Sequence, residues 1–139
     1  MDDRLQIREH EGEGFKALVT FRDWRVGILR AEADMVQCAV ASMERHTETD
    51  EVFVLTGGRA ILLLGGSARE VEAVRPQAMD IGRIYNVRRN AWHTILMSRD
   101  ASIVIVESDD TGPENSEYAD ISAELRQAIL EIALREQLV

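Results

Sequence analysis

The sequence is poor in cysteine: its 139 residues include one, Cys38. A single thiol cannot form an internal disulfide or supply the cysteine pair of a zinc site, so a reducing compartment, the cytoplasm, is the expected location. The first ten residues carry too many charges for a secretory signal peptide. The longest apolar run, residues 60–64, is far too short to cross a bilayer, so no membrane partner is expected.

Positive charge is also scarce, because 16 Lys and Arg stand against 25 Asp and Glu and give a formal net charge of −9. Binding to a phosphate backbone needs clustered Lys and Arg that replace counterions, so the composition argues against a nucleic-acid partner. The sequence has no P-loop, no G-x-S-x-G elbow and no G-x-G-x-x-G fingerprint. The length fits one domain with a modest core.

The chain divides into three parts. Residues 1–14 are mostly polar, contain Glu-Gly-Glu-Gly and are expected to form an N-terminal arm. Residues 15–119 carry short segments rich in Val, Ile and aromatic side chains, separated by turns, which predicts an all-β barrel or sandwich domain. Residues 120–139 have apolar positions at helical spacing behind a capping residue, Asp120 or Ser122, and predict a C-terminal α-helix.

Turn residues place the strands within the β domain. The clearest hairpin is expected to join residues 51–55 to residues 59–64 through Gly57-Gly58, because glycine supplies the positive φ of a tight turn. Pro76 predicts a loop, since proline is excluded from central strands. Residues 108–118 read as a polar loop. Strands are expected at residues 17–21, 24–29, 35–43, 51–55, 59–64, 70–74, 84–87, 92–97 and 102–107.

Two stretches, residues 44–58 and 82–93, hold the residues that could carry chemistry. Side chains two apart on a strand face the same way, so Glu44 and His46 can point together. Glu51 follows after a loop, and His93 would come from a distant strand. A first-row divalent ion needs three or four N or O ligands that converge, which these residues could supply. A solvated turn rich in His and carboxylates is the alternative.

The first stretch resembles the first motif of the cupin superfamily, G-x5-H-x-H-x3/4-E-x6-G. Glu51 then falls on the motif's Glu and Gly58 on its final Gly. With a four-residue gap, His46 falls on the second His. Glu44 occupies the place of the first His, and Cys38 that of the leading Gly.

The second stretch is similar to the second cupin motif, G-x5-P-x-G-x2-H-x3-N. Gly82 and His93 match at the right separation. Arg88 stands for Pro and Met97 for the last Asn. Asn90 stands for the inner Gly, and Asn is the residue besides Gly that best tolerates a left-handed backbone.

The resemblance implies a cupin jelly-roll β-barrel followed by the C-terminal helix. It also implies a divalent metal ion, Mn, Fe, Ni or Zn, bound by His46, Glu51, His93 and Glu44. A carboxylate in the place of a histidine can still ligate. The alternative is that Glu44 marks a lost metal site, which leaves a pocket that binds organic ligands unaided.

For function, the resemblance favours a small metal-binding cupin that acts on a small organic metabolite with isomerase, lyase or oxygenase chemistry. Glu44 and Tyr85 are the candidate catalytic residues. The alternative is a non-catalytic module that binds or senses a small metabolite. A homodimer is the expected assembly, through the N-terminal arm or the C-terminal helix, because exposed strand edges require covering.

Strand alternation predicts the walls of the pocket. Phe53 and Leu55 should share the face of Glu51, and Ile95 and Met97 that of His93, so that the metal end has an apolar backing. Trp92 should face away from the pocket and pack between sheets.

The neighbouring segments offer further polar side chains. Asn115 and Tyr118 are expected to fix the C-terminal helix rather than contact a ligand.

Overall fold

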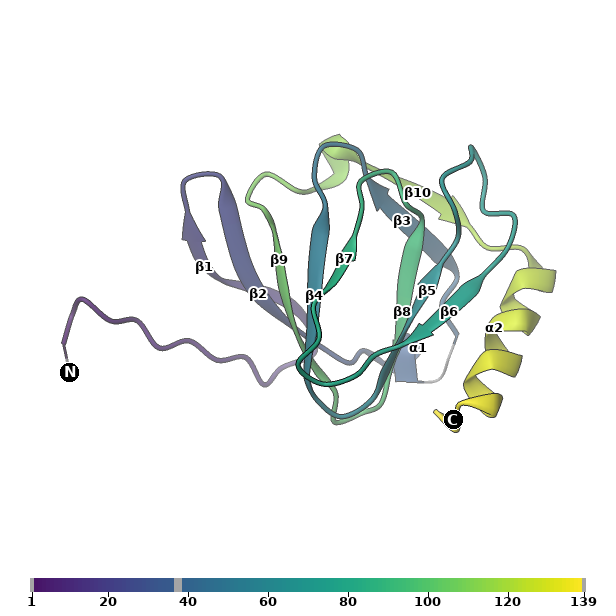
Figure 1. Cartoon of the computed structure of the whole chain (residues 1–139), viewed down its shortest axis with the longest axis horizontal. Helices are drawn as coiled ribbons and strands as arrows, with labels where there is room; N and C mark the ends of the chain where they lie inside the picture. The colour runs from purple at the N-terminus through teal and green to yellow at the C-terminus, as the bar shows by residue number, and fades with distance from the viewer. Residues whose placement is uncertain (1, 37–38, 139) are drawn as a thin grey trace.

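The computed structural model describes residues 2–36 and 39–138, and it shows two five-stranded antiparallel sheets that face each other (Figure 1). Sheet A has the strand order β1-β2-β9-β4-β7, and sheet B has the order β10-β3-β8-β5-β6. The sheets are stacked in a jelly-roll-like arrangement with helix α2 beside sheet B, so the predicted all-β class and C-terminal helix are confirmed. The strands of sheet A are β1 Gly14–Phe21, β2 Trp24–Arg30, β9 Ser102–Ser108, β4 Glu51–Gly57 and β7 Tyr85–Val87. Those of sheet B are β10 Ser116–Asp120, β3 Ser42–His46, β8 His93–Met97, β5 Ala60–Leu64 and β6 Arg75–Ala78, and the helical segments are α1 Ala33–Val36, η1 Pro113–Asn115 and α2 Ala123–Arg135.

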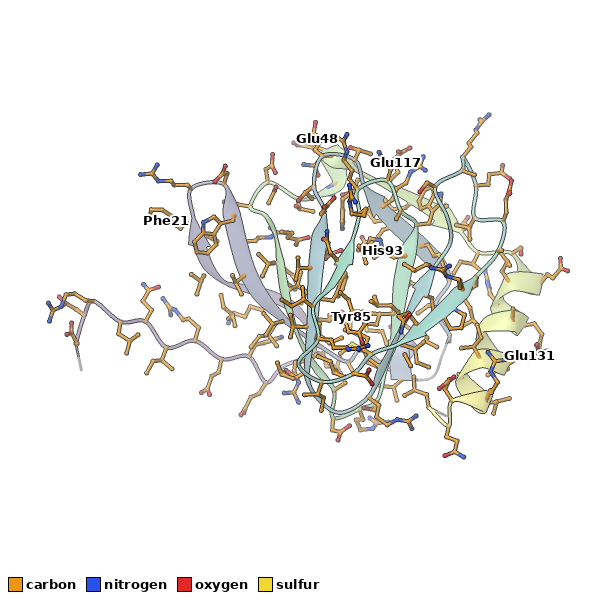
Figure 2. The ribbon with its side chains drawn as sticks, viewed as in Figure 1. Phe21, Glu48, Tyr85, His93, Glu117 and Glu131 are labelled. Carbon is orange, nitrogen blue, oxygen red and sulfur yellow. The ribbon has the colours of Figure 1, made fainter. Side chains whose placement is uncertain are left out.

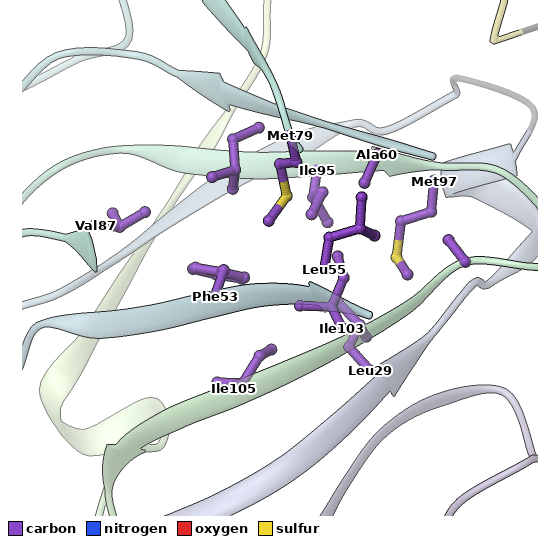
Figure 3. Close-up of a cluster of buried hydrophobic side chains, with 12 residues drawn as sticks. Leu29, Phe53, Leu55, Ala60, Met79, Val87, Ile95, Met97, Ile103 and Ile105 are labelled. Carbon is purple, nitrogen blue, oxygen red and sulfur yellow. The ribbon is translucent and has the colours of Figure 1, made fainter. Parts of the chain in front are cut away.

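The main core fills the space between the two sheets (Figure 3). Alternate residues of each strand point inward, so Phe53 and Leu55 of β4 meet Ile95 and Met97 of β8, as the alternation predicted. The full set of buried side chains is Leu29, Phe53, Leu55, Ala60, Leu62, Met79, Val87, Ile95, Met97, Ala101, Ile103 and Ile105.

A second core lies between the outer face of sheet B and helix α2. Ile61 and Leu63 of β5 point outward here, which explains why this strand is apolar at every position. They pack with Ile129 and Ile132 of the helix. Ser122 caps the helix by accepting a hydrogen bond from the Leu125 N–H at 3.2 Å, one of the two caps predicted.

The third predicted strand, residues 35–43, is wrong over its first part. Residues 33–36 form a single helical turn, which the N–H groups of Met35 and Val36 close by donating to the Glu32 carbonyl. Strand β3 starts only at Ser42. Cys38 lies outside the described residues.

The predicted hairpin at Gly57-Gly58 is also wrong, because β4 pairs with β7 and β9 whereas β5 pairs with β6 and β8. The turn therefore carries the chain from sheet A to sheet B. Gly58 has the positive φ, 70°, that the prediction assigned to this turn, and Gly57 lies within β4.

One strand prediction and two loop predictions are corrected near the edges of sheet B. Residues 70–74 form no strand, and Pro76 lies within β6, opposite Leu63. Proline is tolerated there because β6 is an edge strand and needs no ladder donor on its outer side. Residues 108–118 include η1 and the start of β10, which pairs with β3.

Candidate metal centre

Three strands from both sheets bring four polar side chains to one place. Glu44 and His46 lie on β3, and His93 opens β8 directly opposite Glu44. Glu51 opens β4 in the facing sheet. The centre therefore bridges the two sheets at the ends of their strands, above the apolar core.

The four side chains converge on one point. Each offers one ligand atom, and these atoms all lie within 4.8 Å of one another. The Nε2 atoms of His46 and His93 lie 3.0 and 2.9 Å from Oε1 of Glu51. They lie 3.8 and 3.9 Å from Oε1 of Glu44, whose side chain is 40% exposed. Three buried groups and one half-exposed carboxylate thus face a common space.

The far side of each imidazole is held in place. His93 Nδ1 lies 2.9 Å from the Ala91 carbonyl, which can only accept, so Nδ1 carries a proton. His46 Nδ1 lies 2.8 Å from the Ser116 hydroxyl on β10. These contacts direct both Nε2 atoms at the centre, as the outer hydrogen bonds of metal-binding histidines do.

The charges of the three buried groups depend on one another. Burial alone would raise the pKa of Glu51, but the hydrogen bonds and charges of His46 and His93 outweigh it and lower this pKa to about 2. Burial likewise works to lower the pKa of each histidine, yet the contact with Glu51 raises both values above the usual range. In the metal-free protein Glu51 is therefore ionised and favours protonated histidines.

A cavity of about 510 Å³ opens beside the centre. One part of its wall is apolar and comes from inward-facing strand positions, namely Leu29, Phe53, Ile95 and Ile105. The rest is markedly acidic. Its carboxylates are Glu32, Asp34, Glu44, Glu51 and Glu107.

Glu107 is the carboxylate that the sequence reasoning missed. It lies on β9 and is 7% exposed, and its Oε1 accepts hydrogen bonds from Arg25 Nε at 3.2 Å and Nη2 at 2.8 Å. Burial and the negative charge of Glu51 raise the pKa of Glu107 to about 7, although Arg25 acts in the opposite direction. The signal was present in the alternation, since Ile103, Ile105 and Glu107 share the inward face of one strand.

The predicted ligand positions are brought together, but Tyr85 is not among the residues that line the cavity. Its hydroxyl accepts a hydrogen bond from the Asp80 N–H at 2.8 Å. Tyr85 and His93 lie at different heights of the molecule in Figure 2.

Two further expectations need correction. Trp92 faces away from the cavity as expected, but it belongs to the core under α2 rather than to the space between the sheets. Its Nε1–H donates to the Ala68 carbonyl. Tyr118 lies opposite Glu44 on β10 and lines the cavity, whereas Asn115 accepts from the Gly112 N–H and shapes the η1 turn.

No family model and no curated protein matches this sequence. Solved structures do resemble it. A cupin-2 domain containing protein from Shewanella frigidimarina has a TM-score of 0.51 at 16% identity, and the match covers 73% of this chain and 84% of that chain. KdgF from Halomonas sp. has a TM-score of 0.51 at 13% identity, over 72% and 81% of the two chains. A variant of Streptomyces PAC13 with uridine has a TM-score of 0.54 at 10% identity, over 83% and 85%.

These likenesses show the fold. The chain has the cupin fold. Gly58, Gly82 and Asn90, which the motif comparison placed on glycine positions, all have positive φ, at 70°, 85° and 68°. Among the described residues, no helix is long and apolar enough to cross a membrane.

Proposed function

We propose that this cupin-fold protein is a metal-dependent enzyme that acts on a small organic metabolite in the cavity. The observation that carries the proposal is the convergence of Glu44, His46, Glu51 and His93 at the wall of a cavity large enough for a small molecule. Two imidazoles and two carboxylates suit Mn, Fe, Ni or Zn.

The donor set fits such an ion. Both Nε2 atoms already point at the shared centre, and the Ala91 carbonyl keeps the proton of neutral His93 on Nδ1. Two carboxylates would balance the charge of a divalent ion. A bound ion would supply Lewis-acid chemistry, polarising a carbonyl or hydroxyl oxygen of the substrate.

The protein's own groups would then orient the substrate and move protons. Glu44 is the most exposed of the four groups and has the longest contacts to the histidines, so it is the one best placed to exchange a proton with a bound molecule. Phe53 and Ile95 would exclude water from one side of the substrate. Tyr85, whose hydroxyl accepts a hydrogen bond from the Asp80 N–H, is not proposed as a catalytic residue.

The solved relatives suggest which organic ligands to try first. PAC13 is described as a nucleoside dehydratase, and variants of it are bound to uridine. A dehydratase is a lyase, which is one of the reaction types that the motif resemblance favours. Uridine is therefore a reasonable first probe for this cavity.

A non-catalytic binding module is the second candidate. It is favoured by the contacts of Glu51, whose Oε1 lies at hydrogen-bond distance from both Nε2 atoms, so that these groups satisfy one another without an ion. A pocket of this kind would hold a metabolite through the same apolar and acidic walls.

Elemental analysis of the purified protein separates the two candidates. We expect roughly one Mn, Fe, Ni or Zn ion per chain in the wild type, and little or none in His93→Ala, because three ligands hold a divalent ion far more weakly than four. His10→Ala is the matched control, since His10 does not line the cavity. A wild-type protein that holds no metal and takes up none on soaking would leave the binding module as the function.

The proposal also includes a cellular location and an oligomeric state. The single cysteine favours a cytoplasmic location. The exposed N-terminal arm and the open edge of β1 favour a homodimer.

A further inference from the structure

A buried polar atom on the cavity wall lies beside the metal centre and has no hydrogen-bond donor among the described residues. Glu107 uses Oε1 to accept both hydrogen bonds from Arg25, while its Oε2 is buried and receives no hydrogen bond from a donor among the described residues. The Glu51 carboxylate lies beside Glu107, and the two carboxylates can hydrogen-bond only when they share a proton. A buried polar atom without a partner is costly, and the usual reasons for its presence are a bound molecule or water. Glu107 is among the residues that line the cavity, so a ligand in that cavity would lie beside it.

The arginine beside it is not free to bind an anion. Arg25 is the only Lys or Arg among the described residues that line the cavity. Its Nη1 donates to the Asp109 carbonyl at 3.2 Å, and its Nη2 donates to the Thr111 carbonyl at 3.0 Å as well as to Glu107. The guanidinium also stacks over the ring of Phe15, 5.5 Å from its centre. Arg25 therefore positions Glu107 and offers no open fork to a carboxylate or phosphate.

The remaining charges of the cavity repel anions. A divalent ion at the centre would be balanced by Glu44 and Glu51, which leaves Glu32 and Asp34 on the wall without a cation among the lining residues. Like charges in a partly enclosed space are costly, so a ligand carboxylate or phosphate would meet an unfavourable potential.

We propose that Glu107 is a ligand-binding residue and that the cavity selects an uncharged small molecule with hydroxyl groups, such as a sugar, polyol or nucleoside, over its anionic counterpart. One ligand hydroxyl would hydrogen-bond to Oε2, and a hydroxyl suits this atom because it can both donate and accept. The carbon face of the ligand would pack on Phe53 and Ile105. This deepens the proposed function by naming the substrate class, and it rests on the same cavity.

The test compares matched neutral and anionic probes by NMR titration of the labelled full-length protein: uridine against uridine 5′-monophosphate, and methyl galactoside against galacturonate. We expect at least one neutral probe to bind at millimolar concentration, and each neutral probe that binds to do so about tenfold more tightly than its anionic partner. Equal or tighter binding of the anionic partners would overturn the proposal. Failure of both neutral probes to bind would overturn it as well.

The role of Glu107 is tested with Glu107→Gln, which keeps an acceptor oxygen for Arg25. The variant should bind the neutral probe about tenfold more weakly, as expected for loss of a hydrogen bond to a charged group. Glu131→Gln, on the exposed surface of α2, is the control and should bind like the wild type (Figure 2). Unchanged affinity in Glu107→Gln would remove Glu107 from the proposed site. The neutral-to-anionic comparison uses wild-type protein and so does not depend on how this variant folds.

Metal content measured on the same samples separates this inference from the proposed function. Bound metal together with a preference for anions would defeat the ligand class and leave the metal-dependent function intact. A protein without metal that binds neutral probes through Glu107 would defeat the metal-dependent function and leave the ligand class intact.

Discussion

At the scale of single residues, the contact between Glu51 and the two histidines links the stability of the metal-free protein to pH. A histidine with a higher pKa in the folded state stabilises the fold below its unfolded value, near 6.5, and loses this contribution as pH rises through the folded value. Glu107 acts in the same direction between 4.5 and about 7. Glu51 acts in the opposite direction, since its contribution is present above 4.5 and is lost as pH falls toward about 2.

The metal-free protein should therefore be most stable near roughly pH 4.5, where the contribution of Glu51 is present and those of Glu107 and the two histidines are not yet lost. We expect its free energy of unfolding, measured by urea denaturation in the presence of EDTA, to fall by about 3 kcal/mol between about pH 5 and 8.5. Glu107→Gln should show a smaller fall, and His10→Ala the same fall as the wild type. Metal affinity should rise over the same range, because a metal must displace the histidine protons. A metal-free protein that gains stability with pH would contradict this account of the charges.

The motif spacing could identify the four side chains that converge at the candidate metal centre because it fixes which residue types stand at strand ends. The motif spacing could not identify Glu107. Alternation along β9 places Glu107 inward, but the local sequence does not show which strands of the facing sheet lie opposite β9. Tyr118 was assigned to fixing the C-terminal helix for a related reason. Its segment read as a loop, and only its pairing with β3 brings it opposite Glu44.

At the scale of elements, the turn between β4 and β5 carries the chain from sheet A, which holds Glu51, to sheet B, which holds the other three side chains of the centre. Gly58 has a φ of 70°, and a Cβ there would lie 2.5 Å from Ala101 Cα and 2.7 Å from Ala101 N. Gly57 has no atom within 4 Å of such a Cβ and no positive φ. Gly57 and Gly58 are therefore a matched pair of positions at which to compare the same substitution.

Gly58→Val should lower the free energy of unfolding by about 3 kcal/mol or more, because it combines a left-handed backbone with a clash against backbone atoms. Gly57→Val should change it by no more than about 0.5 kcal/mol, because valine suits a strand. Urea denaturation of both variants beside the wild type measures the difference. Equal losses in the two variants would show that the turn does not have the geometry described.

Most elements followed from local pattern, but their partners did not. The period of residues 51–55 and 60–64 predicts two strands, and the short glycine turn between them favours a hairpin. The deciding factor is non-local, since residues 60–63 are apolar on both faces and need cover from α2 as well as from the opposite sheet. Pro76 shows the same limit. Whether proline is tolerated depends on β6 being an edge strand, which its own sequence does not reveal.

At the scale of the whole molecule, the N-terminal arm extends away from the sheets in Figure 1. Residues 2–9 and 11–13 are exposed, including Leu5 and Ile7, which are 58% and 69% exposed. The arm leads into β1, an edge strand of sheet A. Helix α2 is the rival contact, but its apolar stripe already covers sheet B and leaves only Leu130 and Leu134 outside. The arm is therefore the better candidate for the expected dimer contact.

Analytical ultracentrifugation of three proteins tests this assignment. The full chain should sediment as a dimer, and a chain that begins at Glu13 should sediment as a monomer, because it lacks the exposed apolar residues of the arm. A variant with both Leu130→Glu and Leu134→Glu should remain a dimer and serves as the control for loss of surface apolar area. If this helix variant dissociates while the truncated chain remains dimeric, the contact belongs to α2. If the full chain is a monomer across the micromolar range, the expectation of a homodimer is wrong.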